Sequence, residues 1–180
     1  MNSHPIGFAG LGNVGSPMSI SLLRAGHTVI GHDLRPCQAF VDAGGTMVDA
    51  AKLRQAPVVL FSLPGGAVSR HVVDALLDGP RATRTVIDLS SYALADKQAQ
   101  AARLAGHSIE MLDCEVSGLP AHVAERKAVI FKSGPRPAID ALAPLFDAIA
   151  QQHFHVGDFG AATRLKLIAN TMVCVHSTTR

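Results

Sequence analysis

The chain has 180 residues, of which 48% are hydrophobic and 17% are charged, and its formal net charge is +2 at pH 7. This length and composition suit one folded domain with a substantial core, and they exclude a disordered or fibrous chain. The small net charge provides no basic surface for nucleic acid or for an acidic membrane.

Short apolar runs recur along the whole chain and predict strands. The runs PVVLFSLP and RTVIDLSS are almost uniformly apolar, which is typical of strands that are buried on both faces. The predicted strands cover residues 5–11, 27–33, 57–64, 84–91, 108–116 and 128–134.

Segments with helical spacing lie between these strands. The first of them, SPMSISLLRAG, ends at Gly26, and a glycine at this place commonly stops a helix. The predicted helices cover residues 16–26, 36–45, 69–79, 93–107 and 136–150, and a last helix begins near residue 161. Alternation of strands and helices predicts an α/β fold with a mostly parallel sheet and helices on both faces.

The sequence GLGNVG is a G-x-G-x-x-G that follows a predicted strand and opens a predicted helix. Gly10 permits the tight turn, Gly12 lets the backbone approach a pyrophosphate, and Gly15 lets the helix pack close to the strand. The free N–H groups of the helix start favour phosphate. This context disfavours a glycine-rich turn in an unrelated α/β domain and predicts a Rossmann-type, doubly wound sheet. The predicted cofactor-binding residues of the loop are Gly10, Leu11, Gly12, Asn13, Val14 and Gly15.

Asp33 ends the second predicted strand and can accept hydrogen bonds from the ribose hydroxyls of adenosine. A carboxylate at this place repels the 2′-phosphate of NADP, so NAD is the favoured cofactor. The next residue, Leu34, carries no charge, whereas Arg35 is within reach of a phosphate and leaves NADP open.

The order of motifs resembles the β-hydroxyacid dehydrogenases. This family includes 3-hydroxyisobutyrate dehydrogenase, tartronate semialdehyde reductase and, more distantly, 6-phosphogluconate dehydrogenase. The resemblance begins at GFAGLGNVGSPMSISLLRAGHTVIGHD and continues at FSLPGGAVSRHVV, VIDLSS, LDCEVSG and GAATRLKLIAN. It covers essentially the whole chain, and it implies NAD(P)-dependent interconversion of a small 3-hydroxy acid and its semialdehyde or keto acid.

The resemblance also implies roles for individual residues. Lys166 matches a lysine that acts as general acid or base, because hydride transfer from a carbinol carbon leaves an O–H proton to remove. Asn170, one turn later on the same helical face, matches an asparagine that helps to hold the substrate. Ser117 and Gly118 match a loop that binds the substrate carboxylate. The further implied cofactor contacts are Leu63, Pro64 and Ser91.

Two segments depart from the family pattern. The carboxylate loop reads SGLPAHVAERKAVIF where relatives have small residues, and Pro120 removes one backbone N–H donor, so the substrate acid group is held differently or the substrate differs. Ala162 replaces a usual glycine before the last helix. Near these segments, a buried filler role is expected for Cys114, surface or structural roles for His122, His153 and His155, and solvated charges for Arg126 and Lys127.

The predicted domain organisation has two parts. Residues 1–160 form the NAD(P)-binding Rossmann domain, and residues 161–180 begin an interdomain helix that leads, in relatives, to an all-helical C-terminal domain absent from this chain. The apolar face of residues 165–175 then lacks its usual cover, which predicts self-association, as a homo-oligomer, or binding to another partner. The absence of a signal peptide, of a long apolar run and of Cys-x-x-Cys pairs predicts a soluble cytoplasmic protein with no membrane span and no metal site.

Two other functions share this layout. One is a non-catalytic dinucleotide-binding or interaction module left by loss of the C-terminal domain. The other is an imine reductase, which usually replaces the lysine. The presence of Lys166 argues against both.

Overall fold

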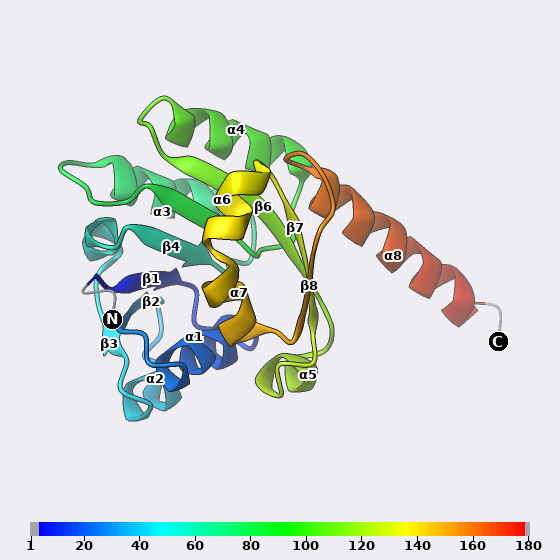
Figure 1. Ribbon diagram of the computed structural model, residues 1–180, viewed down its shortest axis with the longest axis horizontal. Coiled ribbons are helices and arrows are strands. Elements are labelled where there is room, and N and C mark those ends of the chain that lie inside the picture. The colour runs from blue at the N-terminus through cyan, green and yellow to red at the C-terminus, as the bar shows by residue number, and fades with distance from the viewer. Residues whose placement is uncertain (1–3, 179–180) are drawn as a thin grey trace.

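The sheet contains every strand found in the computed structural model, which describes residues 4–178. The strands are β1 Ile6–Ala9, β2 Val29–His32, β3 Thr46–Met47, β4 Val58–Phe61, β5 Thr85–Asp88, β6 Glu110–Ser117, β7 Val129–Ser133 and β8 Gln152–His155. Their order across the sheet is β3-β2-β1-β4-β5-β6-β7-β8 (Figure 1). The sequence did not predict β3 and β8, which lie at the two edges.

All neighbouring strands from β3 to β6 are parallel, β7 runs antiparallel to β6, and β8 is parallel to β7. The short connection between β6 and β7 suits an antiparallel pair, because a parallel crossover needs a dozen or more residues. The strand order reverses between β1 and β4, as it does in the Rossmann fold. The predicted doubly wound, mostly parallel sheet is therefore confirmed.

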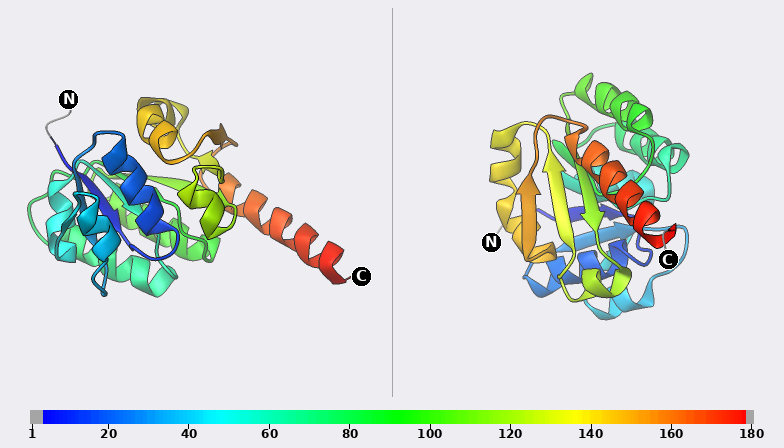
Figure 2. Two further views of the ribbon diagram at one scale, coloured as in Figure 1. Left: turned by 90° about the horizontal axis from the view of Figure 1, so that it is seen from below. Right: turned by 90° about the vertical axis from the view of Figure 1, so that its right-hand side faces the viewer.

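Helices cover both faces of this sheet (Figures 1 and 2). They are α1 Gly15–Arg24, α2 Gln38–Asp42, α3 Gly66–Leu77, α4 Leu94–Ala105, α5 Pro120–Ala124, α6 Arg136–Ala141, α7 Ala143–Ile149 and α8 Ala161–Thr178, with a 3-10 helix at Ala50–Gln55. Helices α1 and α7 pack on one face, and α3 and α4 pack on the other.

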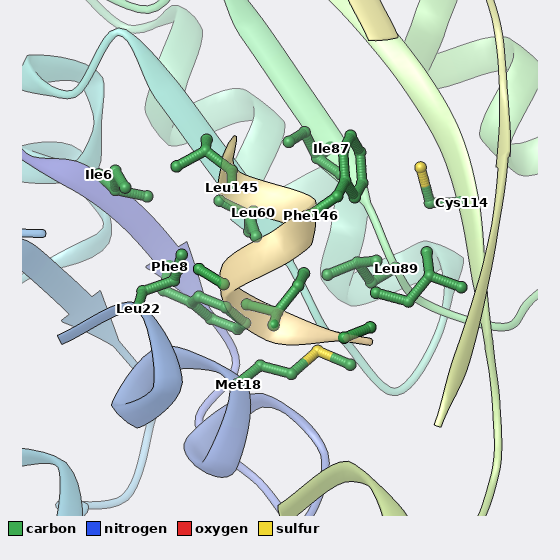
Figure 3. Close-up of a cluster of buried hydrophobic side chains, with 14 of the residues drawn as sticks. Ile6, Phe8, Met18, Leu22, Leu60, Ile87, Leu89, Cys114, Leu145 and Phe146 are labelled. Atoms are coloured by element: carbon green, nitrogen blue, oxygen red, sulfur yellow. The ribbon is translucent and has the colours of Figure 1, made fainter. Parts of the chain in front are cut away.

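Successive residues of the central strands supply the two halves of the core, because side chains alternate across a sheet. Leu60 and Ile87 pack with Phe146 of α7 on one face (Figure 3). Phe61 packs on the other face with Leu104 of α4. Each such buried side chain stabilises the fold by about 1.5–3 kcal/mol relative to an exposed one.

The predicted helix over residues 136–150 is wrong in one respect, because it is broken into α6 and α7 around Leu142. Pro144 has no N–H group, and its ring would clash with the carbonyl of Asp140 in a continuous helix. Pro144 instead lies in the first turn of α7, where no N–H partner is required.

Helix α8 projects away from the sheet, with its first turn against β6 and β7 (Figures 1 and 2). Leu167, Ile168 and Met172 expose 60%, 59% and 60% of their surface. The side chains of residues 173–178 lie outside the described part, and with them Val173 and Val175 of the predicted apolar face. No helix in the described part of the chain is long and apolar enough to cross a membrane.

Candidate functional site

A pocket of about 690 Å³ opens at the carboxyl ends of β1, β2 and β4. This is the place where the strand order reverses, and α/β sheets bind ligands there. The predicted cofactor residues that line it are Gly10, Gly12, Asn13, Val14, Asp33, Leu63 and Pro64. Leu11, Gly15 and Ser91 belong to the same prediction but do not line the pocket.

The glycines of the loop after β1 have different surroundings. A Cβ atom at Gly10, whose φ is +89°, would lie 2.2 Å from the carbonyl oxygen of Ser62, and one at Gly15 would lie 1.9 Å from the carbonyl oxygen of Gly10. A Cβ atom at Gly12 would meet nothing within 4 Å. Within residues 4–178, the N–H groups of Gly12 and Asn13 donate to no protein acceptor. Open space beside free N–H groups fits a dinucleotide phosphate.

Asp33 lies at the rim of the pocket and is fixed by two backbone N–H groups. Its Oδ2 accepts from Leu11 at 2.7 Å, and its Oδ1 accepts from Arg35 at 3.0 Å. Each carboxylate oxygen keeps a further lone pair for a ribose hydroxyl. Leu34, which is 88% exposed, forms the adjoining wall.

The sequence reasoning missed the pocket wall formed by α3. Ala67, Val68 and His71 line the pocket from the first turns of this helix. The prediction began this helix at residue 69, whereas it begins at Gly66, so that two of these residues were assigned to a loop. The turn sequence Leu63-Pro64-Gly65 was the available signal, because the helix begins directly after it.

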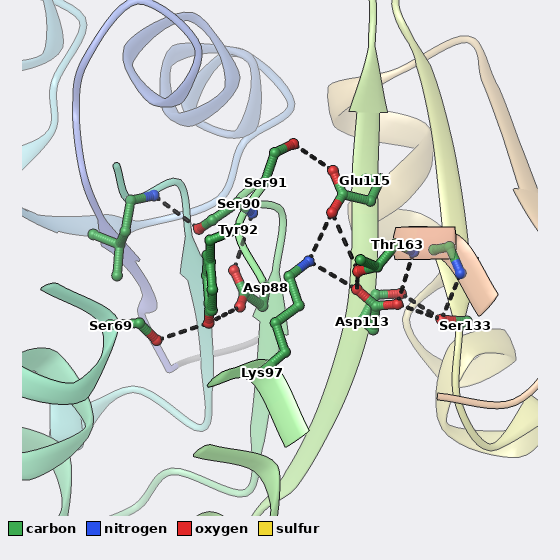
Figure 4. A network of polar contacts seen from close by, with 12 residues as sticks. Ser69, Asp88, Ser90, Ser91, Tyr92, Lys97, Asp113, Glu115, Ser133 and Thr163 are labelled. Carbon is green, nitrogen blue, oxygen red and sulfur yellow. Dashed lines mark hydrogen bonds and ion pairs between the residues drawn. The ribbon is translucent and has the colours of Figure 1, made fainter. Parts of the chain in front are cut away.

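A chain of hydrogen bonds links the pocket to the interior at β5 (Figure 4). The N–H of Leu63 donates to Ser90 Oγ at 2.8 Å, and the N–H of Ser90 donates to Asp88 Oδ1 at 3.0 Å. The hydroxyl of Tyr92 donates to Asp88 Oδ2 at 2.5 Å. Burial raises the pKa of Asp88, and this effect outweighs the opposing ones of Lys97 and of the hydrogen bonds.

A buried ion cluster that the sequence reasoning did not predict lies beside this chain. Lys97 Nζ is 2.8 Å from Asp113 Oδ1 and 2.9 Å from Glu115 Oε1, and these side chains are at most 1% exposed. Burial alone would lower the pKa of Lys97, but Asp88, Asp113 and Glu115 outweigh it and raise that pKa. Burial opposes ionisation of Asp113, yet Lys97 and the hydrogen bonds hold the pKa of Asp113 below its ordinary value.

The predicted substrate-carboxylate loop begins at Ser117, the half-buried last residue of β6. Gly118 follows with a φ of +156°. The N–H of Leu119 donates to His122 Nδ1 at 3.3 Å, and Pro120 has no N–H. This loop therefore offers few backbone donors to an anion.

Lys166 and Asn170 lie on the same face of α8, as their spacing predicts. Lys166 is half-exposed and Asn170 is exposed, and neither lines the 690 Å³ pocket. Ser91 is exposed, and its hydroxyl donates to Glu115 of β6. The predicted residues thus fall into a pocket group and a group around β6 and α8.

The remaining expectations concern side chains near these segments. Cys114 is fully buried, as expected for a filler, and burial raises the pKa of its thiol. His153 and His155 are hydrogen-bonded, to Lys132 and Asp147 and to the Gly134 carbonyl respectively. The expectation for Arg126 is wrong, because this side chain is half-buried and donates to the carbonyl of Asp147.

Residues 5–157 match the family described as the NAD binding domain of 6-phosphogluconate dehydrogenase. The chain belongs to the β-hydroxyacid dehydrogenase family. This member is 31% identical over 178 residues to 3-hydroxyisobutyrate dehydrogenase of Pseudomonas aeruginosa, covering 93% of the chain and 59% of that relative. It is 30% identical over 193 residues to L-threonate dehydrogenase of Escherichia coli, covering 95% and 60%.

Among solved structures, this chain is similar to that of 3-hydroxyisobutyrate dehydrogenase of Mycobacterium tuberculosis with L-serine. The TM-score is 0.91 at 29% identity, over 98% of this chain and 62% of that one. The chain spans 59% and 60% of the length of the two curated relatives.

Proposed function

We propose that this chain supplies the cofactor-binding domain and the proton-transferring lysine of an NAD(P)-dependent oxidoreductase that acts on a small 3-hydroxy acid. The observation that carries the proposal is the place of Lys166 and Asn170 on one face of α8. The first turn of α8 is hydrogen-bonded to β6, which ends at Ser117. These are the residues that could hold and deprotonate a hydroxy acid.

The chemistry divides between the cofactor and the chain. A bound nicotinamide supplies hydride chemistry. Lys166, as the free amine, accepts the proton of the substrate hydroxyl during oxidation. In the reverse direction its ammonium donates that proton and stabilises the negative charge that develops on oxygen. The Asn170 amide and the Ser117 hydroxyl hold the substrate by hydrogen bonds, and the product is a semialdehyde or keto acid.

We propose NAD as the preferred cofactor, with NADP as the alternative. The support is the Asp33 carboxylate at the pocket rim, because it would repel a 2′-phosphate. NADP is kept as the alternative because the backbone N–H of Arg35, a cationic residue, is bonded to the same carboxylate.

We also propose that residues 161–180 begin an interdomain helix and that the enzyme is a homo-oligomer. The exposed apolar residues Leu167 and Ile168 support this, because side chains of this kind at about 60% exposure are commonly covered by a further domain or copy.

The test is NADH formation from NAD over a panel of small 3-hydroxy acids, with Lys166→Ala beside the unaltered chain. Loss of the general acid or base is expected to lower kcat by about 10²–10⁴-fold. NADH affinity, followed by NADH fluorescence, is expected to change little, since Lys166 does not line the pocket. Equal turnover by both chains would overturn the role of Lys166. NADH binding without turnover on any acid would favour the non-catalytic module.

A further inference from the structure

The ion cluster around Lys97 lies between the two groups of site residues. Its ammonium contacts Asp113 and Glu115, which are two positions apart on β6 and therefore point to the same face of the sheet. Each of these carboxylates has a second set of partners (Figure 4). The two sets share the Thr163 hydroxyl, which lies 2.7 Å from Asp113 Oδ1 and 3.3 Å from Glu115 Oε1, and their other partners lie in different parts of the site. No feature of the proposed reaction yet uses this cluster.

Asp113 holds the first turn of α8. Its Oδ2 accepts from the N–H of Thr163 at 3.0 Å, and its Oδ1 accepts from the hydroxyl of Thr163 at 2.7 Å. Ser133, which donates to Asp113 Oδ2 at 2.9 Å, accepts from the N–H of Ala162 at 3.1 Å. The first N–H groups of a helix have no partner within the helix, and a negative charge there is favourable. Asp113 and Ser133 thus fix the start of α8 three residues before Lys166.

Thr163, Lys166 and Asn170 share one face of α8, because residues three, four and seven apart align along a helix. An anchor at Thr163 therefore sets both the rotation and the axial position of the proposed catalytic amine. A loosened first turn would move Lys166 without unfolding the sheet.

Glu115 holds the segment after β5. Its Oε2 accepts from the hydroxyl of Ser91, while the preceding Ser90 holds the N–H of Leu63 in the pocket wall. The two serines therefore connect the cluster on one side and the pocket on the other. The same lysine stabilises both carboxylates as acceptors.

Asp113 and Glu115 cannot keep these roles without a cation between them. Both are buried, so two unpaired negative charges so close together would repel, and one of them would take up a proton. A protonated carboxyl becomes a donor and is a poorer acceptor for Thr163 or Ser91.

We propose that Lys97 is a positioning residue that holds Asp113 and Glu115 as ionised acceptors and thereby fixes α8, with Lys166, relative to Ser91 and the pocket. This inference rests on the proposed function, since it takes Lys166 as the proton-transferring group. Lys97 itself is buried, and it acts through its two carboxylates.

The test compares Lys97→Met with Lys97→Arg, which keeps the charge, and with Lys132→Met, which removes another buried lysine from the opposite face of the sheet. Hydrogen exchange on the unliganded chain, resolved by mass spectrometry, needs no turnover. Lys97→Met is expected to raise exchange in residues 161–170 and 89–92 by about tenfold or more, while β4 stays protected. Lys97→Arg is expected to restore most of the protection, and Lys132→Met to leave both segments unchanged.

Steady-state kinetics provide the second measurement. Lys97→Met is expected to lower kcat by about tenfold or more, with NADH affinity within about twofold of the unaltered chain, and to shift the pH profile of kcat. Unchanged exchange in α8, or the same effect from Lys132→Met, would overturn the inference. The inference would also be overturned if kcat of Lys97→Met equalled that of the unaltered chain in an assay in which the unaltered chain turns over. Absence of turnover by the unaltered chain would overturn the proposed function instead, and exchange would still decide the anchoring.

A further variant covers the case in which Lys97→Met does not fold. Glu115→Gln keeps the Lys97–Asp113 pair and is expected to raise exchange at residues 89–92 more than at residues 161–164. Glu115→Gln leaves the two shorter bonds between Thr163 and Asp113 in place. Equal exchange in both segments, whether raised or unchanged, would therefore contradict the main role assigned to each carboxylate, Asp113 at α8 and Glu115 at the segment after β5.

Discussion

Two buried lysines on opposite faces of the same sheet show what a partner does to a buried charge. Lys97 is 0% exposed and Lys132 is 5% exposed. Lys97 Nζ contacts two carboxylates, whereas Lys132 Nζ lies 2.8 Å from His153 Nδ1, with Asp147 on the far side of that imidazole. Lys132 therefore contacts an imidazole where Lys97 contacts two carboxylates.

The pKa values of the two lysines move in opposite directions. Burial lowers the pKa of Lys132, and among residues 4–178 no carboxylate is bonded to it directly to offset this effect. The carboxylates around Lys97 outweigh the same effect of burial and raise its pKa. Both ammonium groups lie near an aromatic ring, at 5.4 Å from that of Tyr92 and 4.6 Å from that of Phe146, so ring contacts do not explain the difference. The carboxylates beside Lys97 therefore account for the opposite directions of the two pKa shifts.

The largest expected effect is on the free energy of unfolding. Lys97→Met is expected to lower it by about 3–5 kcal/mol, because buried carboxylates then lose their cation. Lys132→Met is expected to change it by less than about 1 kcal/mol, since relief of the buried ammonium offsets the lost bond to His153. Urea unfolding followed by circular dichroism measures both. A similar loss for the two variants would show that burial alone, and not pairing, sets the cost.

A smaller effect shows whether Lys97→Met destabilises the protein through the lost charge or through lost packing of the lysine stem. Adding Glu115→Gln to Lys97→Met is expected to recover about 1–2 kcal/mol, because the amide removes one unpaired charge and can still accept from Ser91. Glu115→Gln alone is expected to destabilise the protein, so the two changes are not additive. Additive losses in the same urea measurement would indicate that packing of the lysine stem, and not its charge, accounts for the effect of Lys97→Met.

The comparison also explains what the sequence could and could not predict. The glycine loop, Asp33 and the carboxyl ends of β1 and β4 follow from local patterns, since each motif is continuous in sequence. Lys97 lies in the segment ALADKQAQAARLA, an amphipathic helix in which the pattern predicts that a lysine faces solvent. Its partners are 16 and 18 residues away on a strand, and Thr163 reaches Asp113 over 50 residues. Only the packing of α4 and α8 on β6 brings these groups together.

The break between α6 and α7 and the edge strand β8 were missed for a different reason. Apolar spacing over residues 136–150 is helical on both sides of Pro144, so periodicity alone did not locate the break. In β8 the sequence QHFH has one apolar residue, Phe154, in four positions, which is too little for the segment to stand out as a strand. Lys132 of β7 contacts His153 of β8, so this contact could not be predicted without β8.

The smallest expected effect is the response to alkaline pH, and it has opposite signs for the two lysines. The folded-state pKa of Lys97 lies above the ordinary value of 10.5, so its contribution is fully present below that value and declines as pH rises beyond it. The folded-state pKa of Lys132 lies below 10.5, so the charged form destabilises the fold, and stability is gained as pH rises through that pKa toward 10.5. Unfolding free energies of the unaltered chain minus those of each methionine variant, measured between about pH 8 and pH 11, isolate the two contributions. The Lys132 difference is expected to grow with pH and the Lys97 difference to shrink only at the alkaline end. If both differences changed in the same direction as pH rises, the carboxylates would not be holding Lys97 charged, and the contrast between the two faces of the sheet would be lost.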